Sequence, residues 1–148
     1  MTAGATMAGV TISRTVEWQD TDAAGHYHHS TVIRWVEAAE TALHERLGLA
    51  HLMGVVPRVH YEVDYRDRLY YREPVSITLR VAEVGRTSLT YTFEVAGPRG
   101  PAAAGRMTVV HVDRDTGAPT PWPPSVRGLA DGAARQAPTT PGTENGAV

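Results

Sequence analysis

Hydrophobic and polar residues alternate along most of the chain, with the period of two that is typical of strands with one buried face. Five segments have this pattern. Their apolar positions are Val10, Ile12, Val16 and Trp18; Val59, Tyr61, Val63 and Tyr65; Val75, Ile77, Leu79 and Val81; Leu89, Tyr91, Phe93 and Val95; and Met107, Val109 and His111. The last segment also carries Val110 and Val112 on its second face, which indicates a central or doubly covered strand.

The segment from Ser30 to Leu49 follows a helical period instead. Its apolar positions are Val32, Val36, Ala39, Leu43 and Leu47. Steps of three and four residues are the spacing of one helix face. Ser30 and Thr31 are typical N-cap residues, and Gly48 is typical of a helix end. We therefore expect one long helix here, with a further helical turn near 125–129.

Short turns join the predicted strands, at 72–74, 85–87 and 97–101, and short connections favour antiparallel neighbours. The expected fold class is α+β, with a five-stranded antiparallel sheet wrapped around one long central helix. A single helix cannot cover such a sheet completely. We therefore expect a second subunit to complete some sheet surface or a strand edge.

The two ends of the chain differ in composition from the part between them. Residues 1–9 and 128–148 are rich in small, polar, Gly and Pro residues and offer almost nothing to bury. We expect a flexible N-terminus over 1–9, one folded domain over 10–127 and a disordered tail over 128–148. The sequence shows no internal repeat.

Composition removes several classes of chemistry. The 148 residues include no Cys, and all 14 residues counted as Lys+Arg are arginine. A thiol nucleophile, a disulfide, a cysteine-bound zinc, a Schiff-base lysine and a phosphate-loop lysine are thereby excluded. A net charge of -2, without a basic patch or a long apolar run, indicates neither a nucleic-acid nor a membrane partner. We expect a cytoplasmic protein.

The densest polar segment, 19–30, lies between the first strand and the helix. The start of a helix offers unpaired N–H groups and the positive end of the helix dipole, which favour an oxyanion. A carboxylate just upstream, Asp20 or Asp22, could act as nucleophile or general base toward the same carbonyl. Asp also suits an ordinary turn, which is our interpretation of Asp20. The motif His26-x-His28-His29 is a weak ligand pattern, so no metal is expected.

The same region carries a family resemblance. The matching motifs are Asp20-Thr21-Asp22-Ala23-Ala24-Gly25, His28-His29-Ser30 and Arg34-Trp35-Val36-Glu37. They are similar to the signature of the hotdog-fold acyl-CoA thioesterases of the 4-hydroxybenzoyl-CoA thioesterase and YbgC type. The resemblance implies the hotdog fold, and it implies hydrolysis of a thioester to a free carboxylic acid and coenzyme A.

The resemblance assigns catalytic roles to two residues. Asp22 aligns with the family's catalytic aspartate, as nucleophile or general base. His29 aligns with the histidine of YbgC-like members, at the position where the family uses a backbone N–H to polarise the thioester carbonyl. Two departures are Trp18, where those members carry a tyrosine, and Thr31-Val32 in place of Asn-Tyr. We expect the first to remove a polar contact and the second to reshape the acyl pocket.

The residues that the resemblance implies for substrate binding are Gly25, Tyr27, Arg86, Thr87 and Ser88. The turn at 86–88 resembles the loop through which these enzymes meet the pantetheine arm and the nucleotide phosphates. Arginine suits phosphate recognition because its planar fork donates hydrogen bonds in pairs.

Other side chains allow more than one interpretation. Arg58 and Arg99 are weaker candidates for a phosphate. Glu37 and Glu40 of the helix either solvate it or pair with Arg34 and His44, or they supply a second carboxylate to a neighbouring active site. Tyrosines 65, 70 and 71 are strand and turn packing residues or line an acyl pocket.

The resemblance also implies partners. Coenzyme A is part of the substrate, so no separate cofactor is expected, and the protein is expected to form a homodimer or homotetramer. An acyl carrier protein thioester is an alternative substrate. A non-catalytic acyl-CoA binder would not need a carboxylate at Asp22, and a hotdog dehydratase would need an H-x-x-x-x-P-G-like segment that is absent. The acyl group, the pathway and the choice between nucleophile and base stay open.

Overall fold

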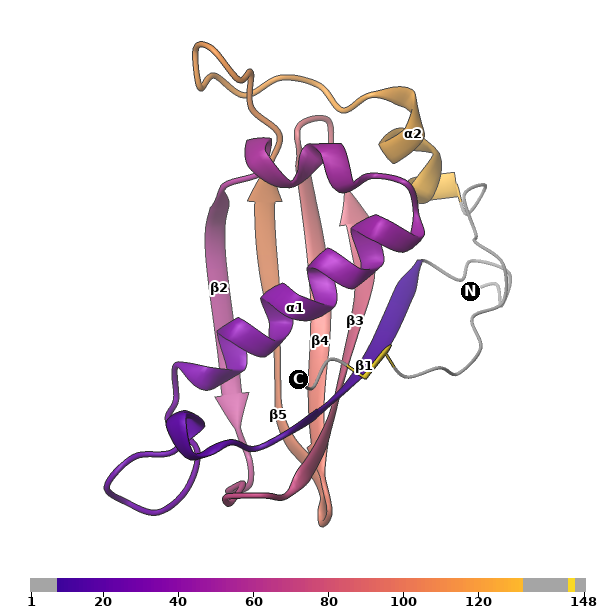
Figure 1. Ribbon diagram of the computed structural model, residues 1–148. Helices are drawn as coiled ribbons and strands as arrows, with labels where there is room; N and C mark the ends of the chain where they lie inside the picture. Colours follow the sequence, from indigo (N-terminus) through magenta and orange to yellow (C-terminus); the bar gives the residue numbers. More distant parts are fainter. Residues whose placement is uncertain (1–7, 132–143, 146–148) are drawn as a thin grey trace.

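The computed structural model describes residues 8–131 and 144–145 (Figure 1). Its strands are β1 (Gly9–Thr15), β2 (Arg58–Tyr65), β3 (Pro74–Val84), β4 (Ser88–Gly97), β5 (Gly100–Val110) and β6 (Glu144–Asn145). Its helices are α1 (Thr31–Arg46) and α2 (Pro124–Arg127), with 3-10 turns η1 (Trp18–Asp20), η2 (Ala50–Val55) and η3 (Gly128–Asp131). The predicted order of one strand, one long helix and four strands is confirmed.

The strands form one sheet in the order β2-β5-β4-β3-β1-β6. The pairings of β1 with β3, β3 with β4, β4 with β5 and β5 with β2 are all antiparallel. This confirms the predicted five-stranded antiparallel sheet. The sixth strand, β6, has two residues and pairs parallel to β1. Two residues are too few for a period to appear in the sequence. β5 lies between β2 and β4, the central position that its apolar second face indicated.

Helix α1 lies across one face of the sheet (Figure 1), as in a hotdog fold. Its predicted apolar face is the buried one, since Val32, Val36, Ala39 and Leu43 are fully buried. Burial of a Val or Leu side chain contributes about 1.5–3 kcal/mol, so this face fixes the helix to the sheet. After the helix, Gly48 has a φ of 75°, a conformation that glycine adopts without strain. Within the described residues, no helix is both long and apolar enough to cross a membrane.

The edge strand β2 does not have the buried face that its alternation predicted. Val59 is 60% exposed and Tyr65 43% exposed, while Tyr61 and Val63 are half-buried. The ladder with β5 shifts register between Arg58 and His60, so Arg58 and not Val59 lies opposite the buried Val109. Alternation shows neither such a shift nor whether another element covers a face. The outer edge of β2 has no neighbouring strand among the described residues. Its backbone groups on that side are therefore available to another strand.

The end of the first alternating segment also differs from the prediction. β1 ends at Thr15, and Trp18 lies in η1 with its side chain 75% exposed. Asp20 turns the chain here, because its carboxylate accepts a hydrogen bond from the Glu17 N–H at 2.8 Å. Such local hydrogen bonding by Asp competes with strand structure.

The packed part of the chain extends past Arg127, where the sequence placed the end of the domain. α2 and η3 form the helical turn predicted near 125–129. Core residues of this segment are Trp122, Val126 and Leu129. At the other end, Ala8 is buried. The remainder of the predicted terminal segments, residues 1–7, 132–143 and 146–148, lies outside the described residues.

Candidate active site

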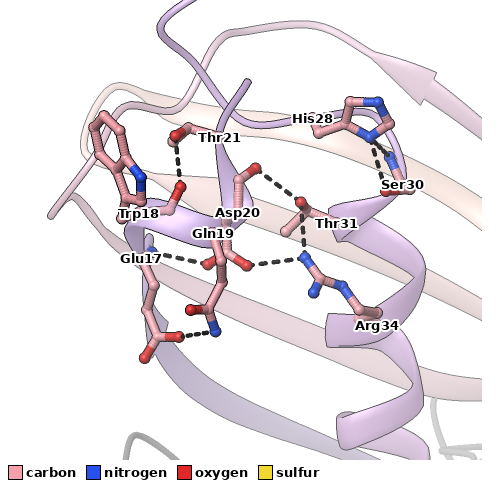
Figure 2. Close-up of polar contacts among 9 residues, drawn as sticks. All are labelled: Glu17, Trp18, Gln19, Asp20, Thr21, His28, Ser30, Thr31 and Arg34. Carbon is pink, nitrogen blue, oxygen red and sulfur yellow. Dashed lines mark hydrogen bonds and ion pairs between the residues drawn. The ribbon is translucent and has the colours of Figure 1, made fainter. Parts of the chain in front are cut away.

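Asp20 holds the loop between η1 and α1 in place (Figure 2). Its buried carboxylate accepts hydrogen bonds from the Glu17 N–H at 2.8 Å and from Arg34 at 2.9 Å. Its backbone carbonyl accepts from the His28 N–H at 2.7 Å and from the Thr31 hydroxyl at 2.9 Å. Asp20 therefore joins η1 to the first turn of α1, in agreement with its interpretation as a structural residue.

Asp22 is exposed in the tight loop that follows. Its N–H donates to the His26 carbonyl at 3.1 Å, and its carbonyl accepts from the Gly25 N–H at 2.9 Å. Its Oδ1 accepts from the Ala24 N–H at 2.8 Å, whereas Oδ2 has no hydrogen-bond partner among the described residues. The loop thus orients the carboxylate through one oxygen and leaves the other available to a reactant.

Gly25 contributes backbone geometry to this loop. Its φ is +88°, and a Cβ at this position would meet nothing within 4 Å. Glycine is the residue that adopts this left-handed conformation most readily. Thr21 and Tyr27 pair across the loop as an isolated bridge. The role of Gly25 that the structure shows is to close the loop that presents Asp22.

The backbone just before α1 differs from residue to residue in its hydrogen bonding. The Ser30 N–H donates to the ring Nδ1 of His28 at 3.1 Å, and the Thr31 N–H donates to the His28 carbonyl at 2.9 Å. The His29 N–H, in contrast, has no acceptor within the described part of the chain. The hydroxyl of Tyr65 donates to the His29 carbonyl and so ties this residue to β2. A free N–H at a helix start is a suitable donor to an oxyanion.

Asp22 and His29 line the same cleft, whose volume of about 470 Å³ is in the range of small-molecule sites. The other lining residues are His26, Tyr27, Tyr65, Arg66, Asp67 and Arg68. Asp22 also borders a second hollow of about 390 Å³. That hollow is lined further by Trp18, Thr21, Ala23, Gly25 and Tyr71. The carboxylate therefore lies between two hollows, a suitable position for acting on a bond that joins two parts of a substrate.

Tyr27 forms a buried wall of the cleft. Its ring stacks on Trp35 with 6.1 Å between centroids, and its hydroxyl donates to the Asp67 carbonyl at 3.2 Å. Burial raises the pKa of Tyr27 to about 12, so the hydroxyl stays protonated at neutral pH. The Tyr27 N–H donates to the Leu69 carbonyl at 2.8 Å. Tyr27 thus ties the Asp22 loop to the segment that follows β2.

The turn of Arg86, Thr87 and Ser88 joins β3 to β4, at the end of the sheet opposite the Asp22 loop (Figure 1). The chain leaves β1 toward the Asp22 loop beside Pro74, the first residue of β3, whereas the turn follows the end of β3. β3 has 11 residues, and at about 3.3 Å per residue its two ends are roughly 35 Å apart. The structure therefore does not bring these three residues together with Asp22 within one chain. The ring N–H of Trp122 donates to the Ser88 carbonyl at 2.9 Å and fixes the turn.

Arg99, a weaker candidate for a phosphate, is already occupied by carboxylates. It lies 2.7 Å from Glu73 and 3.0 Å from Asp67, and it donates to the Arg68 carbonyl at 2.7 Å. Hydrogen bonds to Glu73 and then to Asp67 raise the pKa of Arg99. Arg99 therefore joins the segment after β2 to the start of β3.

Glu40 is fully buried, which corrects the expectation that it solvates the helix. It pairs with Arg58 of β2, and Glu37 lies 3.4 Å from the same guanidinium. Arg58, the other weaker phosphate candidate, is therefore also occupied. Glu40 follows Val36 by four residues and precedes Leu43 by three, so it shares their buried face. Its partner comes from another element, and helix spacing alone could not identify it.

Two lining residues of the cleft, Arg66 and Arg68, were missed by the sequence analysis. Their signal was a charged tract directly after the end of a predicted strand, and the same pattern is typical of a solvated loop. Their approach to Asp22 depends on the contact between Tyr27 and Leu69, which are far apart in the sequence.

The histidines of the loop do not converge on one point. His28 contacts Ser30 through Nδ1 at 2.7 Å, and His26 Nδ1 lies 3.2 Å from the Tyr27 carbonyl. The rings of His28 and His29 lie 4.0 Å apart. Among the described residues, no group of three or more His, Cys, Asp or Glu side chains could hold a metal ion.

An antiparallel sheet wrapped around one central helix is the architecture of the hotdog class of proteins. The family comparison agrees with this class, since the model of the thioesterase-like superfamily matches residues 16–129. The chain belongs to this superfamily. No protein with a curated description matches its sequence.

Solved structures with the same fold include other thioesterases. A predicted thioesterase from Bacillus stearothermophilus is 28% identical, with a TM-score of 0.76, over 88% of this chain and 100% of that one. A DHNA-CoA thioesterase from Staphylococcus aureus is 20% identical, with a TM-score of 0.76, over 83% and 89%. A thioesterase from Thermus thermophilus, complexed with coenzyme A and Zn, is 23% identical, with a TM-score of 0.76, over 86% and 96%.

Proposed function

We propose that this protein is an acyl-CoA thioesterase in which Asp22 acts on the thioester and the His29 N–H polarises its carbonyl. The observation that carries the proposal is that the Asp22 carboxylate and the N–H of His29, just before α1, line one cleft, and that neither Oδ2 nor this N–H has a partner in the described part of the chain. A carbonyl oxygen placed at the N–H gains hydrogen bonding as negative charge develops on it. The carbonyl carbon is then open to attack from the Asp22 side.

Two routes give the same products. As a nucleophile, Asp22 forms a bond from a carboxylate oxygen to the carbonyl carbon, and the C–S bond breaks to release the thiolate. Water then cleaves the resulting anhydride and regenerates Asp22. As a general base, Asp22 instead takes a proton from a water molecule that attacks the same carbon. Either route consumes one thioester and one water and yields one carboxylic acid and one thiol.

We propose coenzyme A as the thiol half of the substrate, in a cytoplasmic protein. The Thermus thermophilus structure complexed with coenzyme A supports this choice. We further propose a homodimer that pairs through the open outer edge of β2, since an edge strand with exposed apolar residues is a natural site for a second sheet. Antiparallel pairing would turn the second subunit end for end. Its Arg86, Thr87 and Ser88 would then approach the Asp22 end of the first.

The test is release of free thiol by the purified protein from short, long and aromatic acyl-CoAs, with acyl carrier protein thioesters as a comparison. The wild type should hydrolyse at least one acyl-CoA. Asp22→Asn should lower the rate by roughly 10³-fold, within the range of general acid–base effects. Asp115→Asn, at an exposed turn distant from the cleft, is the matched control. No thiol release from any thioester would contradict the proposal.

A further inference from the structure

The cleft beside Asp22 carries two arginines that form no ion pair with any residue the structure describes. Arg66 and Arg68 line the cleft, and neither guanidinium has a carboxylate within ion-pair distance among the described residues. Several other exposed arginines of the chain share that property, so the distinguishing feature is their position. Both arginines line the same cleft as Asp22, the candidate catalytic carboxylate.

The second carboxylate of the cleft, Asp67, does not pair with either arginine. Asp67 stands between the two arginines in the sequence, but its Oδ2 accepts from Arg99 at 3.0 Å. Arg99 in turn binds Glu73 at 2.7 Å. Arg99 shares its single positive charge between Asp67 and Glu73, so positive and negative side chains around the cleft are equal in number. What favours an anion here is that the Arg66 and Arg68 guanidiniums have no carboxylate at ion-pair distance among the described residues and can bind one directly.

The backbone that carries the two arginines is fixed. The N–H groups of Arg66 and Asp67 both donate to the Ala102 carbonyl, at 2.8 and 3.2 Å. The Asp67 carbonyl accepts from the Tyr27 hydroxyl at 3.2 Å, and the Arg68 carbonyl accepts from Arg99 at 2.7 Å. A segment held in this way presents its arginines from defined positions, which lowers the ordering cost of binding.

The lining of the cleft also limits what can occupy it. All eight lining residues are charged, aromatic or histidine, and none is aliphatic. A long alkyl chain would find no aliphatic wall here. A short or flat acyl group with a polar end would instead meet the Tyr27 and Tyr65 rings along its length and the arginine forks at its end.

We propose that the substrates of this enzyme carry a carboxylate on the acyl group, and that Arg66 and Arg68 bind it. This inference rests on the proposed thioesterase function and specifies its substrate class. The carboxylate would lie in the same hollow as the reacting carbonyl, where Asp22 would repel it without the two arginines. The phosphates of coenzyme A are separated from the thioester by the long pantetheine arm. An anion close to Asp22 therefore belongs to the acyl half.

The test uses pairs of coenzyme A thioesters that differ only in charge. One pair is 4-carboxybenzoyl-CoA and 4-carbamoylbenzoyl-CoA, and the other is glutaryl-CoA and its terminal amide. For each protein the measured quantity is the ratio of kcat/KM for the carboxylate to kcat/KM for the amide. Both substrates are measured on one preparation, so the ratio does not depend on the folded fraction.

In the wild type the ratio should be roughly 10 or more for at least one pair of substrates, because charge-assisted hydrogen bonds favour the carboxylate. The double variant Arg66→Ala/Arg68→Ala should bring the ratio to about 1 or below. Arg68→Lys, which keeps the charge and loses the fork, should give an intermediate ratio. Arg80→Ala, an exposed arginine on β3, should leave the ratio unchanged.

Two results would overturn the inference and leave the proposed function intact. One is a wild-type ratio near 1 for both pairs. The other is an equal loss on carboxylate and amide in the double variant, which would assign the arginines to coenzyme A or to the fold. If the wild type hydrolyses none of the four thioesters, nor any acyl-CoA of the wider series, the proposed function itself fails.

Discussion

Two carboxylates of this protein, Asp22 and Glu40, lie in opposite surroundings. Asp22 is exposed at a loop, and one of its oxygens has no partner among the described residues. Glu40 is fully buried and paired with Arg58. A buried carboxylate is destabilising by several kcal/mol unless it is paired, whereas an exposed one can stay ionised and meet a reactant. Exposure and a free lone pair therefore distinguish the group available for chemistry from the group that holds the fold.

The buried side of this comparison is a polar cluster of Glu40 and His44 from α1, Arg58 from β2 and Tyr91 from β4. The Nε2 of His44 lies 2.8 Å from the Tyr91 hydroxyl. Burial raises the pKa of Glu40 while Arg58 opposes that shift, and burial lowers the pKa of His44 to about 4. Glu40 Oε2 and His44 Nδ1 have no partner among the described residues. Because the cluster is buried and only partly hydrogen-bonded, a substitution that removes one of its contacts should strongly destabilise the fold.

The largest effect on stability is expected for Glu40→Ala. It leaves Arg58 with only the longer contact to Glu37 and opens a cavity against the sheet, so the free energy of unfolding should fall by about 3–5 kcal/mol. Urea denaturation measures this fall. Glu45→Ala, an exposed change on the same helix, should stay within about 0.5 kcal/mol of wild type. A similar value for Glu40→Ala would contradict the structural role assigned to Glu40.

The second effect concerns pH and His44. The pKa of His44 is lowered to about 4 in the folded protein, whereas it is 6.5 for an ordinary histidine in the unfolded chain. The unfolded state therefore holds more protons between these values, and stability should fall as the pH drops from about 6.5 to about 4, by on the order of 3 kcal/mol in total.

Urea denaturation of wild type and His44→Gln across this pH range checks that dependence. The variant should show a flatter curve, because it lacks the titrating ring. The raised pKa of Glu40 acts in the opposite direction, since its contribution to stability is lost as the pH rises through its folded value. An unchanged slope in His44→Gln would show that another group carries the dependence.

A smaller effect is expected in the loop of Asp22. Gly25→Ala forces a left-handed φ of +88° on a residue with a Cβ, which should cost about 1 kcal/mol of stability. Gly128→Ala is the matched control, because Gly128 has a φ of −63° and its Cβ would also meet nothing within 4 Å. Thermal unfolding should separate the two variants. An equal stability for both would mean that the loop relaxes without strain.

The periodicity of the sequence was sufficient for most of the fold. Helix α1 and strands β3 and β4 carry their apolar residues on a single face, and burial follows that face. The predictions of burial fail where a feature other than periodicity determines the local structure. Val59 of β2 falls at a register shift between Arg58 and His60, which takes it out of the alternation and leaves it 60% exposed. Trp18 continues an alternation that the hydrogen bonds of Asp20 have already ended.

The residues of the candidate site that lie in one continuous segment could be predicted from the sequence. The residues that reach the cleft only through tertiary contacts could not. Asp22 and His29 belong to one continuous loop and helix start, so the family resemblance of that one segment assigned both. Arg66 and Arg68 reach the same cleft through contacts between segments far apart in the sequence. Arg86 was chosen because its turn resembles a family loop and because arginine suits phosphate, and neither reason could show that the turn lies at the other end of β3. Distance along the sheet is not encoded in a local motif.

The most direct test of the account is the rate of thiol release by Asp22→Asn, measured together with its free energy of unfolding. An exposed carboxylate that acts on the substrate should give a loss of roughly 10³-fold in kcat/KM, with stability within about 0.5 kcal/mol of wild type. Activity within 10-fold of wild type, in a variant that is folded and equally stable, would contradict the assignment of the chemistry to Asp22.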